Sequence, residues 1–453
     1  MKKQLLTLAL IIGASSAINA QEKQTALEAL DSIKYVRSSL TMVLIENDDL
    51  GKDKDLVINS YLSNAFPDKY NEHKISDKVF DPKKMTLETK DYLNAGFYVD
   101  TLKSPKDFLM ANRKPFNPIR YVVADSSRAV QEPSKEEITN IYIQKYIIEK
   151  KLANQIASTW FNRKPDGSVD LELVNKLTQL SLQEKEKDEA KTGSLGKDLP
   201  IDSATIKAIR NTYTVFNRLN FFANEPAARI VRDLAKEEAV KNIKIPAALE
   251  KVNKGLDAVY EKTKEGYTVV CNSYLYQFVY NKDIADKSNK YFFGNAVDRL
   301  KAWDTTNLFK MNFVGKTKTV SIVTFKIGEK RTEAEIIELQ VKRTMDKALA
   351  KLQKEYVQFR TLSEVFGEDP VTSAIGLKEG LEHGQTFEVL SREKNIWKSI
   401  GKVTVDKKHP IWDNTQGAEA EVDENEASKP VNQYSTFKGG KDVKKQHFIR
   451  LIK

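Results

Sequence analysis

The spacing of apolar residues predicts a long helix over residues 332–366. Apolar residues in this segment recur every three or four positions, which places them on one face of a helix. They are Ile337, Val341, Met345, Ala348, Leu352, Tyr356 and Phe359. Lysines occupy the opposite face, so the pattern predicts a helix with one side in a core and the other side in water.

The N-terminal part of the chain mixes helix and strand patterns. "SSLTMVLIEN" (38–47) is typical of a strand, and "DKDLVINSYLSNAF" (53–66) has apolar residues at helical spacing before Pro67. Further strands are predicted at "GFYVDTL" (96–102) and "IRYVVAD" (119–125). We therefore expect an α/β domain over residues 21–130.

Helical patterns follow in residues 131–266. Ser134 and Glu137 have the spacing of a capping box, which satisfies free N–H groups at the start of a helix that we expect to reach Trp160. The other helices that we expect here span residues 170–191, 203–222, 225–243 and 245–264. This region is predicted to be a helical domain.

Strand patterns return after residue 266. Residues 267–281 and 308–327 are typical of antiparallel strands, with a turn predicted around Gly315, and give a β segment over 267–331. Residues 367–453 follow the long helix, which we expect to connect the β segment to this last part of the chain. Overall, the sequence predicts an α+β, multidomain fold.

Glycines punctuate the stretch "AIGLKEGLEHGQTFEVL" (374–390) at positions 376, 380 and 384. A phosphate loop would need Lys followed by Ser or Thr after its last glycine, but Gln385 stands there. Charged residues between the glycines exclude helix packing in a membrane. The remaining interpretation is a small β-barrel in which glycines form turns, Leu381 fills the core, and Phe387 and Val389 point inward.

The first twenty residues are typical of a signal peptide. "MKK" is cationic, "LLTLALIIGA" is apolar, and small residues precede expected cleavage after Ala20 or, alternatively, Ala17. No later stretch has the roughly 20 apolar residues that span a bilayer, so we expect no transmembrane segment in the mature chain. Peripheral attachment to a membrane stays open as an alternative.

Charge and cysteine content narrow the function classes. The 73 basic and 63 acidic residues are interspersed along the chain, although the formal net charge is +10. A nucleic-acid-binding protein would concentrate its basic residues on one face, so we expect no nucleic-acid partner. Cys271, the single cysteine, lies in a strand pattern and is interpreted as a buried apolar residue.

No catalytic, metal or cofactor site follows from the motifs. The four histidines lack the short spacing of a zinc site, and no serine lies in a G-x-S-x-G elbow. Residues 162–173 have a calcium-loop pattern in part, but Lys164 and Leu173 stand where oxygen ligands are needed. We predict no cofactor and favour a plain turn in this loop.

The most suggestive polar and aromatic cluster lies near the C-terminus. His409, Trp412 and Asp413 offer a ring and hydrogen-bonding groups, although a structural role for Trp412 in the barrel core is favoured. Together with His383, they are the residues that we predict to bind a ligand or partner, within barrel loops at 376–385 and 409–427.

Four stretches carry a resemblance to known proteins. "GLKEGLEHGQTFEV" (376–389) resembles small β-barrel modules of bacterial envelope proteins, including a flagellar assembly protein and periplasmic scaffolds. "RSSLTMVLIEN", "FPDKYNEHKI" and "WFNRKPDGSVDLELV" resemble large exported envelope proteins of diderm bacteria. The resemblance implies an envelope location and a non-catalytic role, and it supplies no site residues.

These observations predict an exported protein, in the periplasm or on the outer surface of a diderm bacterium, that binds or scaffolds other envelope proteins. One alternative is a glycan or peptidoglycan hydrolase that uses paired carboxylates such as Glu368 and Asp369. Another alternative is a glycan- or calcium-binding module at residues 162–173 or 409–427. The sequence identifies no small-molecule ligand.

Overall fold

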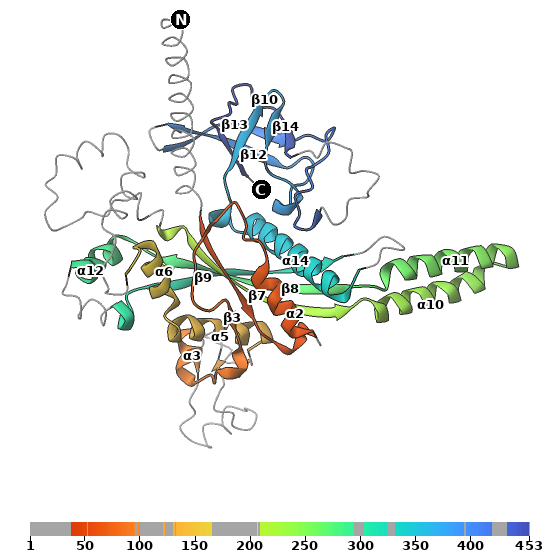
Figure 1. The fold of residues 1–453 in the computed structure, drawn as a ribbon, viewed down its shortest axis with the longest axis horizontal. Helices are drawn as coiled ribbons and strands as arrows, with labels where there is room; N and C mark the ends of the chain where they lie inside the picture. The colour runs from red at the N-terminus through yellow and green to blue at the C-terminus, as the bar shows by residue number, and fades with distance from the viewer. Residues whose placement is uncertain are drawn as a thin grey trace, which may run out of the picture.

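The computed structural model describes residues 38–51, 53–95, 98–99, 121–122, 130–131, 133–164, 206, 209–293, 303–323, 331–393, 396–418 and 433–452. Its body is built on one mixed sheet, and a separate closed barrel lies above a long helix of the body (Figure 1). The fold is therefore α+β with a C-terminal β-barrel, and the predicted fold class is confirmed.

The central sheet has the strand order β2-β1-β7-β8-β9, with β3 also paired to β1. These strands are β1 (Ser39–Ile45), β2 (Asn71–Glu72), β3 (Val79–Phe80), β7 (Thr212–Ala223), β8 (Tyr267–Val279) and β9 (Lys310–Ile322). β1 runs parallel to β7, and β7, β8 and β9 run antiparallel to one another. The three long strands are twelve or thirteen residues each and form the rigid frame of the body.

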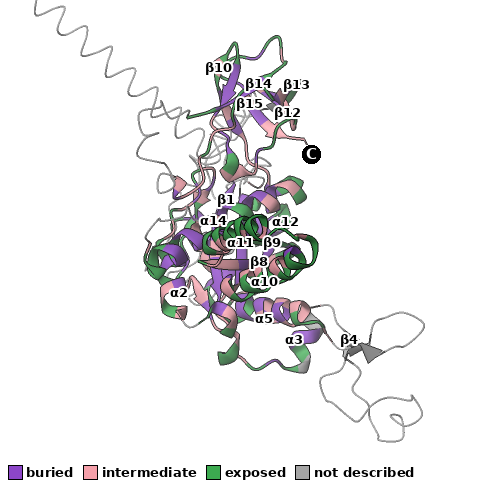
Figure 2. Cartoon of the chain, turned by 90° about the vertical axis from the view of Figure 1, so that its right-hand side faces the viewer, coloured by how far each residue is buried: buried purple, intermediate pink, exposed green. Residues whose placement is uncertain are grey.

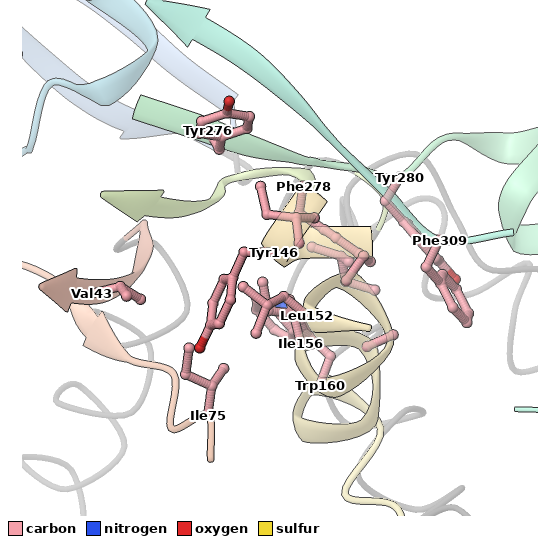
Figure 3. Packing of buried hydrophobic residues seen from close by; sticks show 14 of the residues in the cluster. Val43, Ile75, Tyr146, Leu152, Ile156, Trp160, Tyr276, Phe278, Tyr280 and Phe309 are labelled. Atoms are coloured by element: carbon pink, nitrogen blue, oxygen red, sulfur yellow. The ribbon is translucent and has the colours of Figure 1, made fainter. Parts of the chain in front are cut away.

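Helices cover one face of this sheet through a large aromatic core. α5 (Lys135–Glu149) and α6 (Leu152–Trp160) pack against it, with short α3 (Thr89–Asn94) beside α5 and α12 (Lys282–Phe293) following β8. Ile156 and Trp160 of α6 belong to one buried cluster with Tyr276 and Phe278 of β8 (Figure 3). Burying these large side chains supplies most of the driving force for closing this face.

The opposite face is covered by α14 (Glu333–Glu355) and α2 (Lys54–Ser63). Val341 and Met345 of α14 pack with Leu219 and Val269 of the sheet. A capping box between Thr332 and Glu335 begins α14. The helix is thus fixed both at its start and along its apolar side.

A two-helix arm forms the connection between β7 and β8. α10 (Glu225–Asn242) and α11 (Pro246–Thr263) extend beyond the end of the sheet, side by side, to the right in Figure 1. Figure 2 looks along this arm and shows that most of it is exposed. Ala239 is the buried residue that the two helices contain.

The C-terminal barrel is closed in the order β10-β11-β14-β13-β12-β15. Its strands are β10 (Ser363–Glu368), β11 (Val371–Ser373), β12 (Thr386–Glu393), β13 (Ile396–Val405), β14 (Ser435–Lys438) and β15 (Phe448–Leu451). Leu381, Phe387 and Val389 are all buried in its core. The predicted inward residues of the glycine stretch are therefore confirmed.

Short elements complete the fold. They are the 3₁₀ turns η1 (Asp48–Leu50), η2 (Pro82–Lys84), η3 (Val357–Phe359) and η4 (Leu377–Glu379), and a small sheet of β4 (Tyr98–Val99), β5 (Tyr121–Val122) and β6 (Val130–Gln131). The strands expected in 96–102 and 119–125 are present as two-residue pieces.

The helix predicted over residues 203–222 is wrong, because residues 212–223 form strand β7 in the middle of the sheet. The sheet is also continuous across residues 130 and 266, where the sequence places domain boundaries: β1 pairs with β7, and β7 pairs with β8. Hydrogen bonding across the sheet therefore joins the first three predicted domains into one body.

Three further boundaries differ from the predictions. The helix expected from Ser134 to Trp160 is broken at Lys151, which has a left-handed backbone with φ of 51°. The turn expected at Gly315 is wrong, since β9 continues through that residue, with a shift of its register against β8 between Phe313 and Gly315. The long helix ends at Glu355, and the barrel begins at Ser363.

Several predicted features lie outside the described residues. They are the signal peptide over 1–20, the helix over 170–191, the calcium-like loop beyond Lys164 and residues 419–427 of the predicted loop 409–427. Within the described part of the chain, no helix combines the length and apolar character needed to cross a membrane.

Candidate functional site

Two of the predicted binding residues meet at Asp406, just after β13. Nδ1 of His409 lies 2.8 Å from the Asp406 carboxylate, and Nδ1 of His383 lies 2.9 Å from the Asp406 carbonyl oxygen. The N–H of Lys408 and the His409 ring hold the pKa of Asp406 below its usual value. Both rings are exposed, so this small polar cluster lies at the barrel surface.

Trp412 and Asp413 contact different groups. The N–H of Trp412 donates to Ser435 Oγ at 3.0 Å, and its carbonyl accepts from Leu377 N at 3.0 Å. Its side chain is half-buried, while the neighbouring Ile411 packs against the barrel core. Asp413 accepts from the backbone N–H of Thr415 at 3.1 Å. A ligand at these four predicted residues stays a prediction.

The carboxylates of the hydrolase alternative lie on an exposed turn. Glu368 Oε1 accepts the N–H of Lys445 at 3.2 Å, and Asp369 is exposed beside it. Neither residue lines the pockets beside α2, between α6 and β9, or beside the start of α14. No group of three or more His, Cys, Asp or Glu side chains in the described part could hold a metal ion. The geometry therefore gives this alternative no described cleft.

Cys271 is fully buried between the sheet and α2, as predicted. Burial raises the pKa of its thiol to about 12. The thiol therefore stays protonated at neutral pH and fills space beside Asn217 and Ser273. Its role is structural.

The surface that departs most from an ordinary solvated face lies on the arm. Ile230, Val231 and Leu234 of α10 are exposed, as are Val252 and Val259 of α11. Leu234 is 60% exposed and Val259 is 58% exposed. Clustered apolar exposure of this kind is typical of interaction surfaces, whereas single exposed apolar residues are ordinary.

The contacts between α10 and α11 form a seam along the arm, and the position of this seam determines which way the exposed apolar side chains point. The Arg232 guanidinium lies 4.2 Å from the Tyr260 ring centroid, and Lys236 Nζ donates to Asp257 Oδ1 at 2.5 Å. Tyr260 Oη also donates to Glu225 Oε1 at 2.9 Å. These contacts place charged pairs along the seam and on one side of the hairpin.

The apolar residues point to the other side. A helix turns by about 100° per residue, so Val231 lies roughly 80° and Leu234 roughly 140° around α10 from the buried Ala239. Val252 and Val259 lie roughly 80° and 100° around α11 from Tyr260, in the same rotational sense. Because the two helices are antiparallel, rotation in the same sense about each helix's own axis brings both apolar sets to the same side of the arm. Rotation in the opposite sense brings Lys236 and Asp257 together on the other side. We call these residues, with Ala227, Ile245, Ala248 and Gly255, the apolar face of the arm.

Two lysines border the apolar face along the outer edge of α11. Lys251 and Lys262 are exposed, and neither has an acidic partner among the described residues. Neighbouring lysines differ, since Lys254 pairs with Glu250 and Lys264 pairs with Glu261. The α11 side of the face therefore combines apolar side chains with uncompensated positive charge on its outer edge.

The sequence of α11 contains a spacing pattern that indicates this apolar face, in addition to the pattern that predicts the helix itself. Ile245, Val252 and Val259 are spaced by seven residues, with Ala248 and Gly255 between them. This is the three-four repeat of a coiled-coil seam. Since α11 already packs on α10 through another set of residues that includes Tyr260, a second apolar set indicates a surface for another helix.

Comparison with known proteins gives no family assignment, because no family model and no curated protein matches the chain.

Proposed function

We propose that this chain is an exported cell-envelope protein that acts by binding another protein, and that the arm is its docking element. The observation that carries the proposal is the apolar face of the arm, formed by two helices that project from the rigid sheet. The export signal in residues 1–20 and the envelope resemblance support the location. The body and barrel then serve as the frame that holds the arm.

The occupant that fits this face is an amphipathic helix with acidic flanking residues. The three-four spacing of Ile245, Ala248 and Val252 matches the side-chain spacing of a packed helix. Lys251 and Lys262 are three helical turns apart on one edge and face no acid of their own chain within the described residues. Asp or Glu residues on a partner helix would complement them.

The size of the arm is sufficient for a specific but modest interface. Each helix has 18 residues and is therefore about 27 Å long. With helix axes about 9 Å apart, the two helices together form a face about 18 Å wide, which offers an area of about 500 Å². A partner burying a similar area reaches about 1,000 Å² in total, the lower end of specific interfaces.

Site-specific photo-crosslinking in intact cells tests the proposal. A photoreactive residue is introduced at Val252 or Leu234 of the full-length chain, and the matched control carries it at Lys254, which points away from the apolar face. We expect a crosslinked partner at the first two positions and none at the control. The crosslinked peptide should be amphipathic at helical spacing and should contain Asp or Glu beside its apolar residues.

Reversing the charge of the two edge lysines distinguishes specific binding of an acidic partner helix from non-specific hydrophobic adhesion. Lys251→Glu with Lys262→Glu should lower the crosslinking yield at Val252 by about tenfold, because each lost ion pair at a partly desolvated interface costs about 1 kcal/mol or less and repulsion adds to it. Crosslinks only to a second copy of this chain, or only to lipid, would contradict the proposed partner. Equal crosslinking from Lys254 would remove the arm as docking element.

A further inference from the structure

A groove lies on the body, at the end of the sheet away from the arm. It is formed by α5, α6, residues 306–309 and the first part of β9, and its volume is about 500 Å³. Small-molecule sites commonly have volumes of about 300–1,000 Å³. The groove therefore has room for a small ligand, and it is independent of the arm.

Seven of the fourteen residues that line the groove are apolar or aromatic. Its apolar lining residues include Ile147, Ile148, Tyr276, Phe309, Met311 and Phe313. Tyr276 and Phe309 belong to the aromatic core beneath it, so the wall is anchored in the body (Figure 3). Ile148 is 50% exposed and Phe313 is 41% exposed, which leaves apolar surface in contact with water. A bound apolar group would cover this surface.

Two lysines give the groove a positive charge. Lys151 Nζ donates to Asn307 Oδ1 at 2.6 Å and lies 3.4 Å from the carbonyl oxygens of Thr305 and Thr306. Lys310, at the start of β9, is exposed. Among the described residues, neither lysine forms an ion pair with a carboxylate. The acceptors around Lys151 are neutral oxygens, so its charge is positioned but not neutralised.

The left-handed backbone at Lys151 contributes to this placement. Its φ of 51° breaks the helical path between α5 and α6 and lets the lysine reach residues 305–307. Asn154 of α6 also donates to the carbonyls of Trp303 at 2.7 Å and Thr306 at 3.1 Å. Residues 303–307 are thus fixed against α6, and the rim of the groove is held in place.

We propose that this groove binds a free fatty acid, with its carboxylate between Lys151 and Lys310 and its chain along Ile148, Met311 and Phe313. An apolar wall next to uncompensated cations is complementary to a single acyl chain with an anionic head. A neutral ligand of the same length would leave the two ammonium groups without a counter-charge. The anionic head is therefore the specificity element.

Calorimetric titration of the mature full-length chain with laurate tests this site, with dodecan-1-ol as the uncharged analogue. We expect one laurate per chain and at least tenfold weaker binding of the alcohol. Lys310→Met should weaken laurate binding about tenfold and leave alcohol binding unchanged. The matched control is Lys318→Met, which removes an exposed lysine from the same strand outside the groove.

A second variant tests the chain-binding wall. Phe313→Ser, at an exposed position, should weaken laurate and dodecan-1-ol binding alike, because it removes apolar contact without changing charge. Circular dichroism of each variant checks that the fold is intact. Absence of laurate binding, equal binding of laurate and the alcohol to the wild-type chain, or equal weakening by Lys318→Met would each overturn the proposal. Tighter binding of lysophosphatidic acid than of laurate would overturn the carboxylate assignment.

Discussion

The carboxylate of Asp346 in α14 accepts a hydrogen bond from the backbone N–H of Gln416 in the barrel at 2.7 Å. Asp346 is buried, and the loop that carries Gln416 lies against the same helix, where Arg343 bonds to Thr415. This contact joins the barrel to the body. It also places an ionisable group in the junction between them.

Asp346 makes the junction sensitive to pH. Burial is the main cause that raises its pKa from 3.8 to about 6, although the hydrogen bond from the Gln416 N–H and, to a lesser extent, the charge of Lys378 act in the opposite direction. Between about pH 4 and pH 6 the folded state therefore binds more protons than the unfolded state. The stability contributed by protonation is fully present below about pH 4 and is lost as the pH rises through 6.

Asp346→Asn should remove this dependence. The amide keeps an oxygen acceptor for Gln416 and carries no charge. As the pH rises from 4 to 7, the unfolding free energy of the variant should increase by about 3 kcal/mol relative to that of the wild type. This value follows from the difference between the folded and unfolded pKa of Asp346. Urea unfolding at several pH values measures the difference. A constant difference over this range would contradict the assignment.

His73 should produce the opposite dependence. It is buried against Trp160, with ring centroids 4.9 Å apart, and burial lowers its pKa from 6.5 to about 4. The folded state therefore binds fewer protons than the unfolded state in this range. Its stability contribution is present above about pH 6.5 and is lost as the pH falls through 4.

His73→Gln replaces the ring with a side chain that does not titrate. Wild-type unfolding free energy should fall relative to this variant by about 3 kcal/mol between pH 7 and pH 4. Tryptophan fluorescence during urea unfolding reports the transition, because Trp160 lies beside the substitution. The control is His383→Gln, which replaces an exposed histidine of the barrel. The same pH profile in both variants would contradict a specific effect of His73.

Strand β7 shows why the sequence pattern predicts a helix where the structure has a central strand. Tyr213, Val215, Phe216 and Leu219 are all fully buried, because helices cover both faces of the sheet. A strand buried on both faces lacks the apolar–polar alternation that identifies strands, and residues 215, 216 and 219 also fit helical spacing. Tertiary packing, which a sequence pattern does not contain, decides between the two.

The barrel was predictable for the converse reason. Phe387 and Val389 are buried, and Glu388 between them bonds to Arg450 at the surface. Each barrel strand has one face in the core and one in water, so alternation is visible in the sequence. Gly380 and Gly384 have φ of 70° and 85°, which identifies them as the turn glycines of the predicted pattern.

Neither the arm nor the groove is among the predicted sites. The helices of the arm were predicted, but exposure of Leu234 and Val259 depends on their projection from the sheet. Lys151 and Lys310 are 159 positions apart in the chain (310 − 151), and both line the groove because α6 lies next to β9. A single sequence contains no direct signal for such a pairing.

Gly315 and Tyr356 provide a test of the packing of α14 on the sheet. Tyr356, directly after α14, lies across Gly315 of β9 and donates to the Lys316 carbonyl at 2.9 Å. A Cβ at position 315 would overlap the tyrosine ring. Gly315→Ala should therefore lower the unfolding free energy by about 1–3 kcal/mol, the usual cost of overpacking.

A double-mutant cycle with Tyr356→Ala isolates this contact. Removing the ring makes room for the alanine, so the double variant should be more stable than the sum of the two single losses predicts. Gly255→Ala is the matched control, because no atom lies within 4 Å of its added Cβ. In the helix α11 that substitution should stabilise by about 1 kcal/mol. Additive losses in the cycle would show that Gly315 serves the strand itself rather than the tyrosine contact.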